Sequence, residues 1–449
     1  MSIKVAAQAL LYNQPRAANG ISASVHRQGK DGKSTFLRDI VVPLVDYGSD
    51  FTLEELQDLE PDRYVIQADL PNGKVFTQGF EIEEGKETEV VFRIPHEGPH
   101  EWSSLHALTG QFWSEYVETE RFSKSLAGAS MDYQDSRASP EHGYSLAWIV
   151  PRQPGPGTIE ASPELPGRLC EVIRNKLDVV AATERLGELK EIETPSLWDN
   201  DFAIFRFEHD GILPGEEQST TGHSMLRHEP VARNYLVQRS GEGAQLICLP
   251  TPWMTPDGQA EVELLVKMHN LDEALDYSMT IGEPMINTAL GYINNGAIHL
   301  AQRLIDFKLA RKMLGEKMSY PLSATVGGYI LVLGRNTPSY RQQSDNWKSW
   351  VRNLDNWFEW LPDGAILQGA MHLMDKGGDE DVARDAFMRA FSRGLPFFTF
   401  GLKHLIDGMR YFARKDDEDA ADRLATLQTI ASRADPGVPF LSVQFSNKW

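Results

Sequence analysis

The sequence contains little cysteine and no excess of basic residues. Only two of its 449 residues are cysteines, Cys170 and Cys248, so a disulfide framework does not organise the fold. We expect each cysteine to behave as a small buried apolar residue. The chain has 64 acidic and 44 basic residues, for a formal net charge of -20. This balance disfavours nucleic-acid binding, which requires a positive field along the phosphates.

Segments that would direct the chain to a membrane are also missing from the sequence. No apolar run reaches about 18 residues, the length that a membrane-spanning helix requires. Residues 1–25 contain no basic segment followed by a long apolar stretch, so no signal peptide is visible. We therefore expect a cytoplasmic protein without membrane contact. Its apolar content of 41% is typical of a globular chain, and its length predicts two or three domains.

Familiar catalytic motifs are absent from the sequence as well. It has no G-x-S-x-G elbow, no G-x-G-x-x-G fingerprint, no C-x-x-C pair and no kinase signature. The segment Gly29–Thr35 resembles part of a P-loop, but it lacks the first glycine and precedes a strand-like segment. We therefore predict a polar hairpin turn at this segment, and we expect no cofactor.

The pattern of apolar residues predicts an α+β multidomain protein whose first region is a β-sandwich. Residues 1–122 contain short segments of alternating apolar and polar residues, most clearly over Arg63–Phe80. Pro71-Asn72-Gly73 supplies the hairpin turn within that segment, since Asn-Gly tolerates a positive φ. The region looks like the immunoglobulin- or transthyretin-like modules of bacterial proteins, which usually serve contact and not chemistry.

A stretch rich in proline and glycine indicates the clearest domain boundary. We predict a linker over residues 123–166, because Pro151, Gly155 and Gly157 interrupt helices and strands. Exposed linkers of this kind tolerate proteolytic cleavage. Pro151, Gly155 and Gly157 are therefore our candidates for a cleavage linker.

The remaining sequence predicts a mixed α/β region over residues 167–282 and an all-helical domain over residues 283–449. Apolar residues at helical spacing predict helices over Leu169–Leu189 and Ile286–Met313. Acidic residues begin the segment Asp379–Phe391 and arginines follow, which suits the dipole of a helix. We expect antiparallel helical hairpins in the last region.

One short motif matches that of zinc hydrolases. His96 and His100 flank Glu97 in the order H-E-x-x-H, and His106 lies where a third zinc ligand would follow. Zinc binding needs the first two histidines on one helical face, but Gly98-Pro99 interrupts a helix there. We interpret the match as the exit of a strand followed by a helix, with no metal site. A zinc-dependent hydrolase is retained as an alternative function.

Four tryptophans lie within fourteen residues of the C-terminal region, namely Trp347, Trp350, Trp357 and Trp360. Trp350, Leu354 and Trp357 share helical spacing, so one interpretation is a buried stripe. The other interpretation is an interaction surface, since tryptophan is frequent among the residues that dominate binding energy. The basic segment Arg303–Lys317 leaves a nucleic-acid-associated effector as a second alternative function.

Several short motifs rich in glycine, proline and aromatic residues are distributed along the chain. They are Pro321 with Gly327-Gly328-Tyr329, Trp350-x-x-Asn353-Leu354, Trp360-Leu361-Pro362-Asp363-Gly364, Arg393-Gly394-Leu395-Pro396, Gly401-Leu402-x-x-Leu405-x-x-Gly408 and, in the first region, Pro99-His100-Glu101-Trp102. Together they resemble a group of bacterial proteins that accompany caspase-like or CHAT peptidases in prokaryotic conflict systems. The resemblance covers roughly half of the chain and assigns no catalytic residue. It implies a non-enzymatic partner, regulator or cleavage substrate of such a peptidase in antiviral defence.

Overall fold

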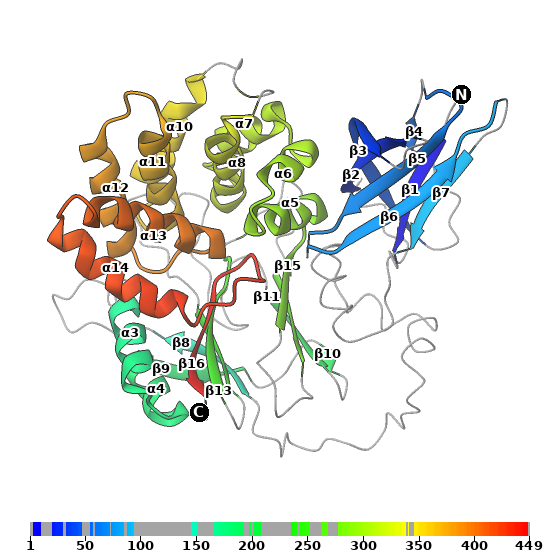
Figure 1. The fold of residues 1–449 in the computed structure, drawn as a ribbon. Helices are drawn as coiled ribbons and strands as arrows, with labels where there is room; N and C mark the ends of the chain where they lie inside the picture. The colour runs from blue at the N-terminus through cyan, green and yellow to red at the C-terminus, as the bar shows by residue number, and fades with distance from the viewer. Residues whose placement is uncertain are drawn as a thin grey trace, which may run out of the picture. The chain divides into compact units, whose positions relative to one another are not determined.

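The computed structural model describes most of the C-terminal part of the chain and separate segments before it (Figure 1). The described residues are 3–9, 20–29, 33–46, 54–56, 59–71, 73–84, 88–93, 145–150, 165–192, 197–198, 202–207, 235–239, 243–251, 253, 262–267, 277–337, 340 and 345–447. The chain divides into two compact units. The first combines residues 1–112 with 280–309, and the second combines residues 113–279 with 310–449.

The first unit contains a seven-stranded sheet of mixed direction. Its strands are β1 (Ile3–Ala9), β2 (Gly20–Gln28), β3 (Ser34–Asp46), β4 (Glu54–Leu56), β5 (Arg63–Asp69), β6 (Val75–Glu81) and β7 (Thr88–Arg93). They follow the order β4-β1-β3-β2-β5-β6, and β7 pairs with β1. The long strand β3 pairs antiparallel with β2 and, at its end, parallel with β1. An N-terminal β region is therefore confirmed, while its identity as a sandwich stays a prediction.

Two hairpins of this sheet are those that the sequence predicts. β5 and β6 pair antiparallel, and Gly73 in their turn has a φ of 83°. The Leu70 N–H closes this turn by donating to the Lys74 carbonyl at 2.8 Å. Between β2 and β3, the Gly29 N–H donates to the Lys33 carbonyl at 2.8 Å. The described residues on both sides of the P-loop-like segment are thus paired as in a hairpin, whereas Lys30–Gly32 lie outside the described residues.

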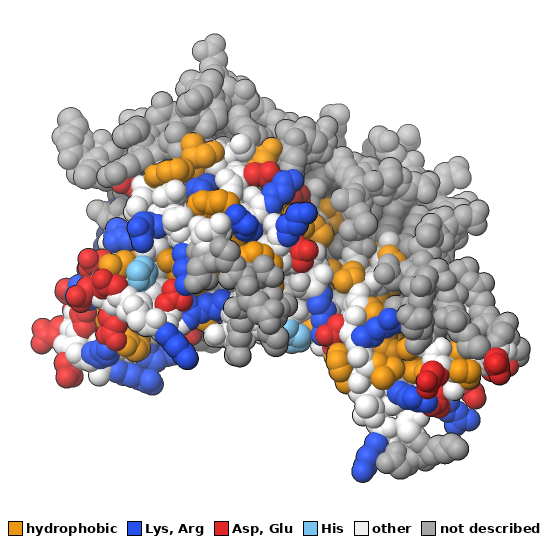
Figure 2. Space-filling model, turned by 90° about the horizontal axis from the view of Figure 1, so that it is seen from above, with side chains coloured by type: hydrophobic (Ala, Val, Ile, Leu, Met, Phe, Trp, Pro, Cys, Tyr) orange, Lys and Arg blue, Asp and Glu red, His pale blue; other side chains and the backbone are white. Residues whose placement is uncertain are grey.

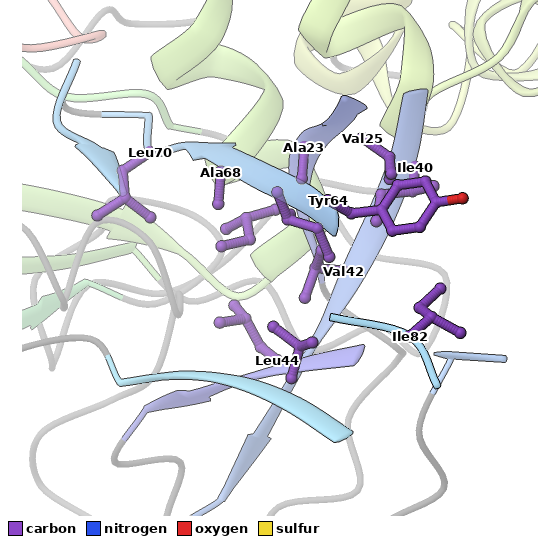
Figure 3. Packing of buried hydrophobic residues seen from close by; sticks show 12 residues of the cluster. Ala23, Val25, Ile40, Val42, Leu44, Tyr64, Ala68, Leu70 and Ile82 are labelled. Carbon is purple, nitrogen blue, oxygen red and sulfur yellow. The ribbon is translucent and has the colours of Figure 1, made fainter. Parts of the chain in front are cut away.

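The alternation of these strands builds one apolar cluster in the first unit. Tyr64, Ile66 and Ala68 of β5 are buried, whereas the residues between them are only partly buried. This is the period-2 pattern of a strand with one face on a core. Figure 3 shows the cluster, which comprises Ile21, Ala23, Val25, Ile40, Val42, Leu44, Tyr64, Ile66, Ala68, Leu70, Ile82 and Val90.

The helix α5 (Pro284–Asn294) carries a tyrosine that holds two strands of the same unit. The Tyr292 hydroxyl accepts the Ser22 N–H of β2 at 2.9 Å and donates to the Asp69 carbonyl of β5 at 2.5 Å. Ser22 and Asp69 are opposite each other where β2 and β5 pair. The hydroxyl therefore satisfies a donor and an acceptor at the end of this strand pair, and burial raises the pKa of Tyr292.

The apolar run Ile286–Met313 forms three helices where the sequence predicts one. They are α5, α6 (Ile298–Leu304) and α7 (Phe307–Gly315). Gly296 interrupts the first two with a φ of 76°, and the Asp306 carboxylate starts α7 by accepting the Leu309 N–H at 2.8 Å. The apolar period continues across both breaks, so it could not reveal them.

The second unit contains two sheets and most of the helices. The five-stranded sheet has the order β16 (Ser442–Asn447), β13 (Gly243–Cys248), β12 (Tyr235–Arg239), β8 (Ser145–Val150) and β9 (Glu188–Glu191). The four-stranded sheet has the order β10 (Leu197–Trp198), β11 (Phe202–Phe207), β14 (Val262–Lys267) and β15 (Tyr277–Ile281). The last two residues of β15 belong to the first unit. The C-terminal region is helical but not all-helical, because it ends in β16. Cys170 and Cys248 are both buried, as expected.

The remaining helices belong to the second unit, and several begin at an acidic cap. They are α3 (Leu165–Asn175), α4 (Val179–Leu186), α8 (Pro321–Gly334), the 3-10 helix η2 (Asp345–Trp347), α10 (Lys348–Trp357), α11 (Pro362–Met374), α12 (Glu380–Ser392), α13 (Thr399–Ala413) and α14 (Glu418–Ala431). Asp379 and Asp417 accept backbone N–H groups at the starts of α12 and α14. The helix predicted over Leu169–Leu189 is interrupted, because Asp178 caps a new start at α4.

The helix α11 is the centre of the helical part. It packs against α8, α10, α12 and α13 (Figure 1). Every residue from Pro362 to Met371 is buried, as expected of a helix enclosed on all sides. In the part of the chain that the structure describes, no helix is both long enough and apolar enough to cross a membrane.

Replacing Tyr292 with phenylalanine is expected to destabilise the first unit by about 1–3 kcal/mol, since the Ser22 N–H and the Asp69 carbonyl lose their shared partner. Chemical denaturation followed by circular dichroism measures this change. Tyr411→Phe is the matched control, because its hydroxyl binds Glu380 on an exposed surface. Equal stability changes in the two variants would contradict a structural role for the Tyr292 hydroxyl.

Candidate functional site

The four tryptophans of the predicted cluster have two different environments. Trp347 and Trp360 are buried. Trp350 is half-buried and Trp357 is 39% exposed. The buried residues of α10 are Val351, Leu354 and Asp355. Trp350 and Trp357 therefore lie beside the core stripe, and the interpretation that they form it is wrong.

Lys317 lies against the rings of the two less buried tryptophans. Trp350 and Trp357 are seven residues apart on α10, which is close to two turns, so they share one side of the helix. The Lys317 Nζ lies 5.6 Å from the centroid of the Trp350 ring and 5.2 Å from that of Trp357. Arg311 lies over the Trp350 ring as well, at 5.4 Å. We call Arg311, Lys317, Trp350 and Trp357 the α7–α10 surface.

A glycine lets the end of α7 approach α10 at this point. A Cβ at Gly315 would lie 3.2 Å from Cζ3 of Trp350, which is tighter than ordinary contact. The chain then turns after α7, with the Tyr320 N–H bound to the Glu316 carbonyl at 3.0 Å. This turn holds Lys317, which in the sequence is only the last residue of a basic segment, beside the tryptophans.

The α7–α10 surface carries positive charge that the described residues do not neutralise. Lys317 is only 5% exposed, yet it has no carboxylate partner among the residues that the structure describes. Arg311 has none there either, while Lys312 lies 3.8 Å from the carboxylate of Glu316. Burial lowers the pKa of Lys317, and the negative faces of the indole rings favour its charged form. On the face of the molecule that Figure 2 shows, lysine and arginine side chains lie among hydrophobic ones.

The carboxylate of Asp363 joins motifs from four parts of the sequence. Asp363 lies in the first turn of α11 and is fully buried. It accepts the Tyr329 hydroxyl at 2.9 Å and the Phe397 N–H at 2.7 Å. A Cβ at Gly401 would collide with this carboxylate and crowd Tyr329 and Pro396. Burial, followed by the charge of Asp363, raises the pKa of Tyr329.

A second buried carboxylate, that of Asp355, fixes another motif. Arg389 Nη2 binds Oδ2 of Asp355 at 2.6 Å, and Arg393 Nη1 binds its Oδ1 at 2.7 Å. Arg393 also donates to the carbonyls of Asp355 and Leu361, at 3.1 and 3.4 Å. The motif residues of the C-terminal region therefore hold α8, α10, α11, α12 and α13 together. The motifs are visible in the sequence, but the contacts between them are not.

The other predicted site residues fall partly outside the described residues. This applies to His96, Glu97, His100 and His106 of the zinc motif, and to Pro151, Gly155 and Gly157 of the linker. Within the described segments, no group of three or more His, Cys, Asp or Glu side chains is placed to hold a metal ion. Of the basic segment Arg303–Lys317, Arg303 binds Asp39 at 2.6 Å within the first unit.

The region that holds these motifs resembles a known family. Residues 288–447 match the family model of the Y4kD C-terminal domain. The match begins within α5 and ends at the last residue of β16, so it includes Asp355, Asp363 and the α7–α10 surface. No curated protein and no solved structure matched the chain.

Adding a methyl group at the Asp363 contact is expected to destabilise the second unit. Gly401→Ala should cost about 1–3 kcal/mol, because the new Cβ overlaps the Asp363 carboxylate and its neighbours are buried. Gly167→Ala in α3 is the control, since a Cβ added there would meet no atom within 4 Å, and alanine favours helices. Thermal unfolding compares the two variants. Equal melting temperatures would contradict the close approach at Gly401.

Two lysines that lie on aromatic rings, Lys317 and Lys415, should have opposite effects on stability as the pH rises. The pKa of Lys317 is lowered in the folded chain, so wild type should gain stability over Lys317→Met as the pH approaches 10.5. The pKa of Lys415 is raised, first by its hydrogen bond to Glu380. Wild type should therefore lose stability relative to Lys415→Met over the alkaline range. Urea unfolding from neutral to alkaline pH measures both differences, and trends of the same sign would contradict the burial of an unpaired Lys317.

Proposed function

We propose that this chain is a non-enzymatic interaction or regulatory protein whose helical region presents the α7–α10 surface to a partner protein. The observation that carries the proposal is Trp357, a large aromatic side chain that is 39% exposed beside a second tryptophan and two cations. Tryptophan and arginine are frequent among the residues that dominate binding energy. The motifs are compatible with the same function, since Asp363, Arg393 and Gly401 pack the bundle and Trp350 belongs to the α7–α10 surface.

The N-terminal unit is proposed to be a β-sandwich contact module, similar to immunoglobulin- or transthyretin-like modules. The strand order supports this proposal, because the strand β3 pairs with two different strands, first β2 and then β1. Its surface also exposes large apolar side chains, Phe36 at 53% and Val75 at 53%. Exposed apolar side chains on a sheet suit a module that binds other proteins.

The partner is proposed to be a caspase-like or CHAT peptidase of a bacterial antiviral defence system. This rests on the resemblance carried by the motifs around Tyr329, Asp363 and Gly401. The chain would act in the cytoplasm as a regulator or adaptor of the peptidase, or as its cleavage substrate. Cleavage within the stretch from Pro151 to Gly157 would then cut the second unit between β8 and α3.

Two alternative functions gain no support from the described residues. The zinc motif from His96 to His106 lies outside them, and elemental analysis of the purified protein tests it directly. Nucleic-acid binding through Arg303–Lys317 is weakened because Arg303 and Lys312 already face carboxylates.

The proposed function predicts that the chain forms a complex with its caspase-like or CHAT peptidase partner. Size-exclusion chromatography and biolayer interferometry of the two purified proteins measure the complex. Trp357→Ala should weaken binding at least about tenfold if Trp357 dominates the contact. Tyr411→Ala is the matched control, because Tyr411 is similarly exposed, at 36%, and also lies beside a lysine.

The same experiment distinguishes the partner from the substrate version of the proposal. Gel electrophoresis under conditions that activate the peptidase detects cleavage, which the substrate version requires. An intact chain in a stable complex supports a regulator or adaptor. If the two proteins form no complex and no cleavage is detected, the proposed function is overturned.

A further inference from the structure

We infer that the α7–α10 surface recognises a carboxylate-bearing, partly apolar segment of its partner, with the acid bound at Lys317 and Arg311 and an apolar side chain against Trp357. The inference rests on the proposed function and names the chemistry of the partner. The juxtaposition that carries it is a nearly buried lysine between two tryptophan rings, with an arginine over one of them.

Among the described residues, Lys317 has no carboxylate partner, unlike Lys415 and Arg384 of the same unit. Lys415 also lies over an aromatic ring, that of Tyr411 at 4.6 Å, but it binds the Glu380 carboxylate. Arg384 likewise binds Asp417 and reaches Asp419 at 3.4 Å. Lys317 is more buried than either, and the described residues give it no carboxylate. A buried ammonium without a counter-charge is costly, so a carboxylate supplied by a partner would complete the site.

The charge of the α7–α10 surface is opposite in sign to the net charge of the whole chain. Acidic residues outnumber basic ones by twenty, yet two cations lie together on this surface beside exposed aromatic area. Acidic side chains predominate instead at the starts of α12 and α14, where Glu380, Asp381, Glu418 and Asp419 are exposed. Because complementary charge selects partners, the α7–α10 surface is suited to an acidic segment.

The tryptophan rings hold the cations in place before a ligand binds. Lys317 and Arg311 both lie within cation–π distance of Trp350, and Lys317 is within the same range of Trp357. Side chains that are already ordered lose less entropy when a ligand binds. Trp357 keeps 39% of its surface exposed, which leaves apolar area for a neighbouring side chain of the partner.

Single-stranded nucleic acid fits the same residues less well. It binds through bases that stack on aromatic rings and through phosphates that follow a positive groove. Here the ring of Trp350 already lies against two cations and that of Trp357 against one. The net charge of -20 also opposes a polyanion that extends beyond these residues. A short acidic segment meets less of this repulsion.

The test follows the indole signals of the full-length chain by nuclear magnetic resonance. The protein is labelled with ¹⁵N-tryptophan, and the signals of two of its ten tryptophans are assigned with Trp350→Phe and Trp357→Phe. The probes are a short synthetic peptide of alternating glutamate and leucine, the same peptide with glutamine for glutamate, and a thymidine decanucleotide. The glutamate peptide should shift the Trp350 and Trp357 signals selectively, and added salt should reduce the shift.

The variants separate the lysine from the aromatic rings. Lys317→Met keeps the apolar volume and removes the charge, so the shift of Trp357 at a given peptide concentration should fall at least fivefold. Lys415→Met removes the other lysine that lies on a ring and should leave the shift unchanged. Arg311→Gln is a second test at an arginine that is less buried than Lys317, in case Lys317→Met alters the local fold. Circular dichroism confirms that each variant is folded.

Each result supports or overturns the inference. Equal shifts with the glutamate and glutamine peptides, an unaffected response in both Lys317→Met and Arg311→Gln, or no response to the glutamate peptide would overturn it. A stronger response to the thymidine decanucleotide would replace it with nucleic-acid binding. Peptidase binding that is lost in Trp357→Ala but unaltered in Lys317→Met and Arg311→Gln would leave the proposed function standing and remove the acidic segment.

Discussion

The helical part of the second unit depends on the buried carboxylate of Asp363. This single group accepts a hydroxyl from α8 and a backbone N–H from the segment before α13, while its own backbone begins α11. A buried carboxylate is tolerated only where its oxygens are hydrogen-bonded. Here the partners come from segments 34 residues away on either side in the sequence. The carboxylate therefore fixes how these segments meet, and the absence of a side chain at Gly401 leaves room for it.

In the helical part of the second unit, most residues that pack the bundle differ from those that form the α7–α10 surface. Asp355, Asp363 and Arg393 are directed into the bundle: Asp355 binds Arg393 at the end of α12, and Asp363 binds the Phe397 N–H before α13. Lys317 and Trp357 belong to a turn and to a helix flank beside that core. Trp350 does both, since it packs on Gly315 and carries cations on its ring. The motifs that resemble a family thus account mainly for the fold, and they also include Trp350 of the α7–α10 surface.

Local chemistry in the sequence was enough to predict the elements that begin or end at a distinctive residue. The hairpin at Gly73 and the helix that starts at Asp379 follow from a positive φ and from a carboxylate cap. The three helices from α5 to α7 could not be separated, because the apolar period runs through Gly296 without a change. The strand β16 was missed, because a short strand is recognised by its partner, and β13 lies about 200 residues before it.

The candidate surface was only half predictable for a related reason. Helical spacing correctly groups Trp350 with Trp357, but the same spacing describes the buried residues Val351 and Phe358, seven positions apart on the adjacent face. A period states which residues share a face and not which face meets the core. In the sequence Lys317 is only the last residue of a basic segment, and it reaches the tryptophans through the turn after α7.

The position of two cations on a strongly acidic chain also limits how a partner can approach it. Screening at physiological ionic strength reduces interactions between exposed charges beyond about 8 Å. The overall charge of -20 and the local charge of Arg311 and Lys317 therefore act at different ranges. At a distance an acidic partner gains nothing from this chain, and only at contact do the two cations and the indole rings favour it. An interface built in this way owes its affinity to fit at the α7–α10 surface and little to electrostatic steering. It would discriminate between acidic segments by their apolar residues, because Trp357 is the part of the surface that remains open to them.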